Sequence, residues 1–338
     1  RVSRLPASGF VLVTSSSYFF LRPTTSAIFK PSWPSRGIGA HHMSSAYADN
    51  LSKNSFKGRL NLAPLRDPAS ALRAKSRLLA HLLLAAPASS AVFHTGAGIS
   101  VAAGLPDFRG PDGIWTRQSR GGASRAEAAP ATPFELAVPT LAHTAIATLA
   151  RRGFLSAIVT QNIDNLHRRA SLPPDPSPTP VLELHGNTLL DTCTNCRLRV
   201  PRTSASPTVG FTSRGPDLPC PRCREPAVVD SVLDWHDPLP EPDHALARRV
   251  SADAAWNVVV GSSMQMEPSR GLPRRGRGMV LVNLSEVEGE EAADLVVHGE
   301  ADVVMAAVMA EMGVEVGEAC GEVSVAVEAR CEKVGEEA

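Results

Sequence analysis

The sequence has little of what marks proteins that bind nucleic acid or cross a membrane. Its 34 lysines and arginines are balanced by 34 acidic residues, and this zero net charge argues against nucleic-acid binding over the whole surface. No uninterrupted apolar run approaches the roughly 20 residues that a membrane helix needs, and the nearest one, 78–86, contains His81. We therefore expect no membrane partner. The 338 residues suffice for one large or two ordinary domains.

Acidic residues are also missing from the first 42 positions. This stretch is rich in Ser, Thr and basic residues, a composition typical of an organellar transit peptide. The alternative is translated upstream sequence, with the true start at Met43. In both cases we predict that residues 1–42 are a leader outside the fold. At the other end, residues 314–338 are predicted to form a loosely ordered acidic tail.

Four of the six cysteines form two C-x2-C pairs. Cys193 pairs with Cys196 and Cys220 with Cys223, and 23 residues separate the pairs. This arrangement is typical of a structural zinc site, in which four thiolates close a tetrahedron and leave no position for water. We predict one structural zinc ion in a zinc-ribbon-like module over residues 191–227. The alternative is two disulfides or a thioredoxin-like redox pair.

Short continuous apolar runs alternate with helical patterns elsewhere. Strands are predicted around 91–93, 155–159, 256–260, 279–282 and 295–297, and helices at 71–84, 140–151, 242–252 and 301–312. Continuous hydrophobicity is typical of parallel strands that are buried on both faces. The fold class is therefore predicted as α/β, with a Rossmann-like doubly wound parallel sheet. Residues 43–190 and 228–313 would form this domain, with a helical insert at about 116–152, and the cysteine module would be inserted into it.

Two of the predicted strands run into turns that contain glycine. These turns are Gly96-Ala97-Gly98 and Gly261-Ser262-Ser263. Glycine lets backbone N–H groups approach a pyrophosphate, so two such turns can face one dinucleotide. The dehydrogenase fingerprint G-x-G-x-x-G fails at its third glycine, where Val101 stands, and this disfavours a nicotinamide dehydrogenase.

Polar residues gather in a loop and after two further strands. Asp107, Phe108 and Arg109 can offer a carboxylate, a ring and a guanidinium to one ligand, although an incidental surface ion pair is the alternative. Residues 161–167 follow one apolar run, at the strand end where such sheets bind ligands. His185 follows another run, and histidine is the side chain best suited to act as a base near neutrality. His94, inside a strand, is expected to be a packed core residue.

Together these motifs resemble the sirtuins, the NAD-dependent protein-lysine deacylases. The strings GAGIS (96–100), GLPDFRGPDGIW (104–115), TQNIDNLH (160–167) and ELHGN (183–187) are followed by the cysteine pairs, GSS (261–263) and VNLS (282–285). The likeness extends over about residues 73–314. The segment VLDWHDPLP (232–240) is similar to the class IV branch, of the sirtuin six type, and MSSAYA (43–48) is similar to the start of that branch.

The resemblance implies an NAD site, one structural zinc ion and a role for each motif. It implies a phosphate loop of Gly96, Ala97 and Gly98; ribose, nicotinamide and phosphate contacts from Asp107, Phe108 and Arg109; a cover from Trp115; a nicotinamide and ribose pocket of Gln161, Asn162 and Asp164; adenosine contacts from Gly261, Ser262, Ser263 and Asn283; adenine neighbours Glu300 and Ala301; and His185 as general base.

The implied reaction releases nicotinamide and transfers the acyl group of an acyl-lysine to the ribose, giving free lysine and O-acyl-ADP-ribose. Mono-ADP-ribosyltransferase side activity is expected from the branch. The implied partners are acyl-lysine proteins, histone tails among them, and chromatin. The resemblance implies a nuclear protein, whereas the acid-free leader leaves a plastid or mitochondrion open.

Two residues depart from the family pattern. Val101 stands where the sirtuin six type has a threonine, which removes one hydroxyl near the phosphates, and Asn165 replaces a glycine. Asn is the non-glycine residue best able to adopt left-handed backbone angles, so the turn can survive. If it does not, Asp164 is misplaced, and the alternative is a weakly active, NAD-binding chromatin protein.

Overall fold

The computed structural model describes residues 51, 57–121, 131–171, 179–210 and 219–316. The chain divides into two compact units, residues 1–39 and 40–338, and every described residue belongs to the second. The predicted leader and all but three residues of the predicted acidic tail therefore lie outside the described residues.

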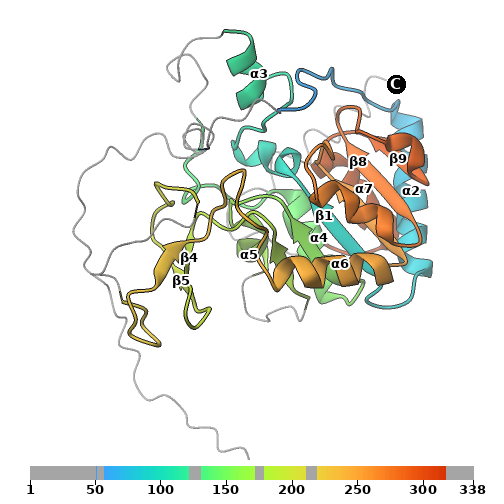
Figure 1. Ribbon diagram of the computed structural model, residues 1–338. Helices are drawn as coiled ribbons and strands as arrows, with labels where there is room; N and C mark the ends of the chain where they lie inside the picture. Colours follow the sequence, from blue (N-terminus) through green and yellow to red (C-terminus); the bar gives the residue numbers. More distant parts are fainter. Residues whose placement is uncertain (1–50, 52–56, 122–130, 172–178, 211–218, 317–338) are drawn as a thin grey trace, which may run out of the picture. The chain divides into compact units, whose positions relative to one another are not determined.

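A six-stranded parallel sheet lies at the centre of the described unit (Figure 1). Its order is β3 (Val181–Glu183), β2 (Leu155–Thr160), β1 (Ala91–Thr95), β7 (Trp256–Val260), β8 (Met279–Asn283) and β9 (Leu295–His298). From β1 the chain winds outward to β3, and from β7 it winds outward to β9. The switch point of this doubly wound sheet therefore lies between β1 and β7, which is where such sheets bind ligands. The predicted fold class is confirmed.

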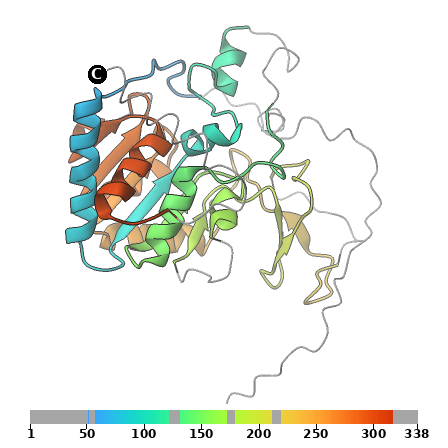
Figure 2. The ribbon, with the colours of Figure 1, turned by 180° about the vertical axis from the view of Figure 1, so that it is seen from behind.

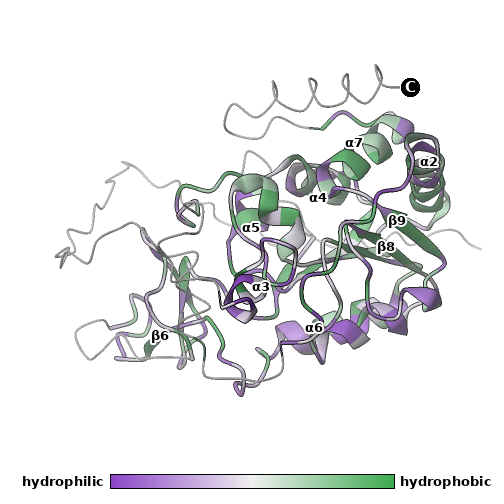
Figure 3. Ribbon diagram, turned by 90° about the horizontal axis from the view of Figure 1, so that it is seen from above, coloured by the Kyte–Doolittle hydropathy of each residue, from purple (hydrophilic) through white to green (hydrophobic). Residues whose placement is uncertain are grey.

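Helices cover both faces of the sheet (Figures 2 and 3). On one face lie α2 (Ala69–Ala85), α4 (Leu141–Arg151) and α7 (Ala301–Met312), and on the other lies α6 (Asp243–Asp253). Neighbouring residues of β1 enter opposite cores, because Phe93 packs with the three-helix side and Val92 with the α6 side. Burial on both faces explains why the strands are continuous apolar runs in the sequence.

Helix α4 is part of the main fold rather than an inserted element. It begins with a capping box, in which the Thr140 hydroxyl accepts from the His143 amide and the His143 ring accepts from the Thr140 amide. Its buried face, with Ile146 and Leu149, packs into the same core as α2 and α7. The described part of the helical insert predicted at about 116–152 contains this helix and α3 (Ile114–Ser119), and α3 is absent from the core clusters that pack on the sheet.

The cysteines belong to a second, antiparallel sheet with the order β5-β4-β6. Its strands are β4 (Leu190–Cys193), β5 (Arg199–Pro201) and β6 (Val228–Asp230). This sheet extends slightly beyond the predicted module limits of 191 and 227. The remaining short elements are α5 (Leu166–Ala170) and the 3-10 helices η1 (Ala97–Ala103), η2 (Ser269–Gly271), η3 (Pro273–Arg275) and η4 (Glu290–Ala292). Among the described helices, none combines the length and apolar character that a bilayer crossing requires.

Candidate active site and metal centre

The two predicted glycine turns pack directly against each other at the switch point of the sheet. The Gly98 amide donates to the Gly261 carbonyl oxygen at 2.9 Å. A Cβ on Gly98 would lie 2.8 Å from that oxygen, and a Cβ on Gly261 would lie 2.5 Å from the Ile99 nitrogen. Gly261 also has a φ of 65°, which favours glycine. The close backbone contact therefore requires both glycines, and it places the two turns at the mouth of one crevice.

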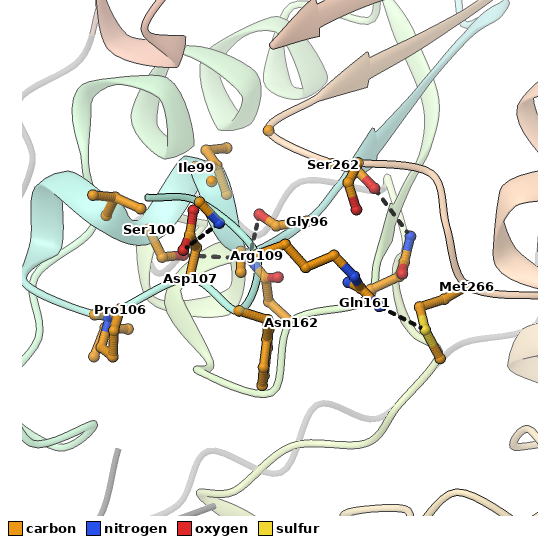
Figure 4. A pocket seen from close by; sticks show the side chains of 18 of the residues that line it. Gly96, Ile99, Ser100, Pro106, Asp107, Arg109, Gln161, Asn162, Ser262 and Met266 are labelled. Carbon is orange, nitrogen blue, oxygen red and sulfur yellow. Dashed lines mark hydrogen bonds between the residues drawn. The ribbon is translucent and has the colours of Figure 1, made fainter. Parts of the chain in front are cut away.

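The loop after η1 is held by aromatic and cationic contacts. The Arg109 guanidinium lies 4.6 Å from the ring centroid of Trp115, and its Nε donates to the Lys57 carbonyl at 2.9 Å. Trp115 also contacts Phe108, at a centroid distance of 4.7 Å, and stacks on Trp235 at 5.4 Å. In Figure 4 the Arg109 side chain extends toward Met266, whose sulfur lies 3.0 Å from Nη2. The guanidinium is thus anchored from several sides.

Burial changes the acid–base properties of this loop. It raises the pKa of Asp107, although the Gly110 amide, which donates to its Oδ1 at 3.1 Å, opposes the shift. Burial also lowers the pKa of Arg109 to about 10, so the guanidinium remains charged at neutral pH. The loop is therefore not a surface turn with an incidental ion pair, which was the alternative interpretation.

The polar residues after β2 are tied to the first glycine turn. Asp164 accepts from the Ser100 hydroxyl at 2.6 Å and from the Leu166 amide at 2.9 Å. Burial raises the pKa of Asp164, and these two hydrogen bonds partly counteract it. Asn162 donates to the Gly96 carbonyl at 3.0 Å. Asp164 and Asn162 therefore keep fixed positions beside the turn.

Asn165 adopts the left-handed conformation that the sequence requires, with φ 65° and ψ 6°. Its side-chain Oδ1 accepts from Nδ2 of Asn187 at 2.8 Å. The turn therefore survives the replacement of glycine, and the backbone strain is compensated by a hydrogen bond that glycine lacks. Asp164 is not misplaced.

His185 follows β3 and lines the same crevice. Its Nδ1 lies 3.0 Å from the Gln161 carbonyl oxygen, which can only accept, so Nδ1 carries the proton and Nε2 is the basic nitrogen. Burial lowers the pKa of His185 to about 4, so the ring is neutral at neutral pH. A Cβ on the next residue, Gly186, with φ 83°, would collide with the Ser231 carbonyl, so the turn after His185 requires glycine.

One cavity of about 1230 Å³ collects the residues that the sequence singled out. It is lined by Gly96, Ala97, Gly98, Asp107, Phe108, Arg109, Trp115, Gln161, Asn162, Asp164, His185, Gly261, Ser262, Ser263, Asn283, Glu300 and Ala301. Figure 4 shows Gln161 and Ser262 pointing toward each other, 3.5 Å apart, from two strand ends. The structure thus brings together every predicted residue of the NAD site. Their individual roles remain predictions.

Sequence reasoning missed several residues of this cavity. Ser100, Trp235, Gln265 and Met266 also line it or hold its lining residues. The string GAGIS contained Ser100 and the class IV segment contained Trp235, so the motifs did carry a signal for both. His94 lies within the core, as expected, with Nε2 2.8 Å from Asn257 Oδ1, and burial lowers its pKa to about 4.

The four cysteines of the second sheet form one cluster. Their sulfur atoms all lie within 4.8 Å of one another, with 3.6 Å between Cys193 and Cys223 and 3.5 Å between Cys196 and Cys220. These distances are far longer than a disulfide bond of about 2.05 Å. They suit a zinc tetrahedron, whose bonds of about 2.3 Å separate the sulfurs by roughly 3.8 Å. The disulfide alternative is therefore wrong, and the donor set fits one structural zinc ion.

The thiols of the cluster differ in acidity, since the pKa of Cys196 is raised to about 11 and that of Cys220 is lowered to about 6. Hydrogen bonds from the Asn195 side chain and from the Glu225 backbone lower the pKa of Cys223. A metal needs the deprotonated sulfur, so this shift supports binding.

His143 and His167 form a second buried polar feature beneath the site. Their ring centroids are 4.7 Å apart, and His167 Nε2 hydrogen-bonds Thr95 Oγ1 at 2.8 Å. Burial lowers the pKa of His167 to about 3 and that of His143 well below its usual value. Both rings are therefore neutral at neutral pH, and they hold Thr140 at the start of α4 and Thr95 at the end of β1.

Comparison with known proteins gives one consistent family. Residues 96–268 match the Sir2 family. The chain is 35% identical over 286 residues to the NAD-dependent protein deacetylase Sirt6 of Drosophila melanogaster, covering 82% of this chain and 87% of that protein. It is 34% identical to the NAD-dependent protein deacetylase SRT1 of Arabidopsis thaliana, over 81% of this chain and only 57% of the relative's length.

Solved structures agree with the sequence relatives. A Sir2 structure described as a complex with a p53 peptide and NAD+ has a TM-score of 0.53 and 30% identity, and covers 71% of this chain and 100% of that one. A Sir2 structure described as bound to acetylated peptide has a TM-score of 0.52 and 28% identity, with the same coverage. The likeness to the sirtuin six type that the motifs predicted is confirmed. The chain belongs to the Sir2 family, the sirtuins.

Proposed function

We infer that this chain is an NAD-dependent protein-lysine deacylase that produces nicotinamide and O-acyl-ADP-ribose. The observation that carries this inference is His185. It is a neutral imidazole whose Nδ1–H donates a hydrogen bond to the Gln161 carbonyl oxygen. Its basic Nε2 belongs to the same cavity as the two glycine turns and the polar residues after β2. A base and a dinucleotide cradle in one crevice are what deacylation by NAD requires.

The residues present fit NAD. Gly98 and Gly261 let the two turns pack backbone against backbone, and both turns line the cavity at the switch point where doubly wound sheets bind dinucleotides. Arg109 remains charged and is anchored on Trp115, where it would offset phosphate charge. When bound, NAD supplies an activated ribose carbon and nicotinamide as the leaving group. Asn162 and Asp164 would hold the nicotinamide and ribose end, and Asn283, Glu300 and Ala301 the adenosine end.

The surroundings of His185 prepare it to act as a base. His185 is in the base form at neutral pH, so it can take a proton from a ribose hydroxyl at Nε2 without a prior ionisation. The hydrogen bond from Nδ1 to the Gln161 carbonyl stabilises the charge that the ring then acquires. A zinc ion held by the four thiolates would be structural, because four protein ligands would leave it no open position for water or substrate.

We further propose that the substrates are acyl-lysine proteins, histone tails among them, that the protein works on chromatin in the nucleus, and that mono-ADP-ribosyl transfer accompanies deacylation. The similarity to Sirt6 of Drosophila and to the human sirtuin-7, 32% identical, both named as protein deacetylases, supports the protein substrate. A plastid or mitochondrial location is the alternative that the acid-free leader supports. Fluorescent fusions of the full chain and of a chain that starts at Met43 would be located in cells by microscopy. A full chain in plastids or mitochondria would support a transit peptide, and both chains in the nucleus would support the start at Met43.

The alternative of a weakly active binding protein rested on Val101 and Asn165. Asn165 keeps the turn and positions Asp164, which removes one of the two reasons. The other reason, Val101, remains. It lines the cavity and is 49% exposed, and it lacks the hydroxyl group that a threonine would offer there.

Nicotinamide release from NAD tests the function directly. We expect the purified chain to release nicotinamide in the presence of acetyl- or myristoyl-lysine histone peptides, and not with unmodified peptides. His185→Ala should abolish release while NAD binding, followed by tryptophan fluorescence, persists. Acyl-independent binding of NAD with no release would instead support the binding protein, and full activity of His185→Ala would refute its role as base.

A further inference from the structure

A buried carboxylate connects the two sheets beside the catalytic base. Glu183 ends β3, two residues before His185, and its side chain is only 3% exposed. Its Oε2 forms ion pairs with Arg168 of α5 at 2.9 Å and with Arg199 of β5 at 2.7 Å. Its Oε1 accepts from Asn187 Nδ2 at 2.5 Å. A buried carboxylate is stable only with partners of this kind on both oxygens.

Arg199 is the partner that comes from the cysteine module. It lies in β5, three residues after Cys196, and its other guanidinium nitrogen pairs with Asp243 of α6 at 2.8 Å. The planar fork thus bridges two carboxylates of the main fold, a geometry that a lysine cannot reproduce. Arg199 thereby connects the module to the strand that carries the base and to α6. Ser231, directly after β6, adds hydrogen bonds to the Asn187 amide and carbonyl at 3.1 and 2.9 Å.

Asn187 extends the network on the other side of His185. Its Nδ2 donates to Asn165 Oδ1 as well as to Glu183, and its Oδ1 accepts from the Leu189 amide at 2.9 Å. Asn165 follows Asp164 directly. The residues on both sides of His185 are therefore fixed by one polar network, and Arg199 connects this network to β5.

We propose that Arg199 is a positioning residue that makes the geometry of His185 depend on the closed metal-binding module. This inference rests on the proposed deacylase function. With the four thiolates gathered, β5 holds Arg199 against Glu183, and the turn 184–187 keeps the His185 ring on the Gln161 carbonyl. Without Arg199, Glu183 loses one of two cations and the turn is released, which moves the base relative to bound NAD.

Variants of Arg199 test the proposal against a matched control in the same module. Arg202 also lies beside the small sheet, but its ion pair is with Asp191 of β4, at 3.0 Å, within that module. A misplacement of about 1 Å can cost roughly a hundredfold in rate. We therefore expect Arg199→Ala to lower kcat by about 10- to 100-fold with the KM for NAD within about threefold, and Arg202→Ala to lower kcat by less than about threefold. Arg199→Lys should be intermediate. Zinc content should be one ion per chain in all three variants.

Equal losses of kcat in Arg199→Ala and Arg202→Ala would overturn the proposal. So would a change of Arg199→Ala confined to the KM for NAD, or a loss of its zinc, because either would show a role in binding or in module folding instead.

Amide hydrogen exchange over residues 184–189 of the full chain gives a readout that does not need activity. We expect faster exchange there in zinc-loaded Arg199→Ala, unchanged exchange in Arg202→Ala, and faster exchange in the wild type when zinc is chelated. Unchanged exchange in Arg199→Ala would refute the link. If the wild type released no nicotinamide while exchange followed the expected pattern, the deacylase function would fail and the positioning link would stand.

Discussion

The six-stranded sheet and the cysteine module are stabilised by different forces. The large sheet buries Phe93, Ile146 and Leu149 completely among its helices, so apolar burial stabilises it. The module's own buried cluster consists of Cys193, Cys220 and Val228. Two of these three residues are metal ligands, so without zinc little remains to fold the module. The base belongs to the first region, and polar contacts such as that of Arg199 connect it to the second.

Removal of one thiolate should have the largest effect, and it should separate the two regions most clearly. Structural zinc contributes an apparent binding free energy of about 10–16 kcal/mol in small zinc modules. We expect Cys220→Ser to lose zinc and all nicotinamide release, and to keep most of its helical circular dichroism, because the large core does not use the metal. Metal analysis of the purified protein and far-UV spectra measure both. Cys331→Ser, which keeps all four cysteines of the C-x2-C pairs, should retain zinc and activity.

A cavity in the large core should destabilise that region without removing the metal. Phe93 is completely buried, so Phe93→Ala should lower the free energy of unfolding by about 3–5 kcal/mol. Urea denaturation measures the loss, and zinc content in native buffer should stay at one ion per chain. Leu78→Ala, at a side chain that is 47% exposed, should change the free energy by less than about 0.5 kcal/mol. A loss below about 1 kcal/mol for Phe93→Ala would contradict the assignment of the core.

Acidification should weaken the large region through its buried histidines. The pKa of His94 is about 4 in the folded chain and about 6.5 in the unfolded one, so between these values the unfolded state binds more protons. Stability should therefore fall as the pH drops from 6.5 toward 4. His94→Gln should reduce the loss between pH 7 and pH 4.5 by about 2 kcal/mol. Any zinc loss in acid affects both proteins equally, so it cancels in the difference between their free energies of unfolding. An identical pH dependence of the two proteins would exclude His94 as a contributor.

The smallest effect is expected at Asn165, between the two regions. Asn165→Ala loses the hydrogen bond to Asn187 and keeps the left-handed strain, so it should cost about 1–2 kcal/mol. Asn165→Gly loses the same bond but relieves the strain, so it should lie within about 1 kcal/mol of the wild type. Thermal denaturation ranks the two variants, and a glycine variant less stable than the alanine variant would disprove the strain argument.

The sequence predicted the large region well, because each of its elements has a local signal. The predicted helix 301–312 coincides with α7, and the strands β1, β2, β7, β8 and β9 were each expected within two residues of their observed ends. Parallel strands buried on both faces are continuous apolar runs, and the glycine turns that follow them are equally local. The metal ligands were recognisable because C-x2-C spacing is fixed by the geometry of one ion.

The small sheet had no such signal. β5 and β6 have three residues each, with polar and apolar side chains mixed, and each pairs with β4 rather than with the other. The helix predicted at 140–151 coincides with α4, but an amphipathic pattern does not reveal which surface the helix covers.

The sequence by itself determined the succession of strands and helices, the zinc ligands and the residues around the nucleotide crevice, because short local patterns of residues reveal each of them. Only the tertiary structure decided that Trp115 stacks on Trp235, that Asn187 supports the left-handed Asn165, and that Arg199 meets Glu183. Each of these contacts joins segments far apart in sequence, and their burial and direction exist only after the two sheets have folded against each other.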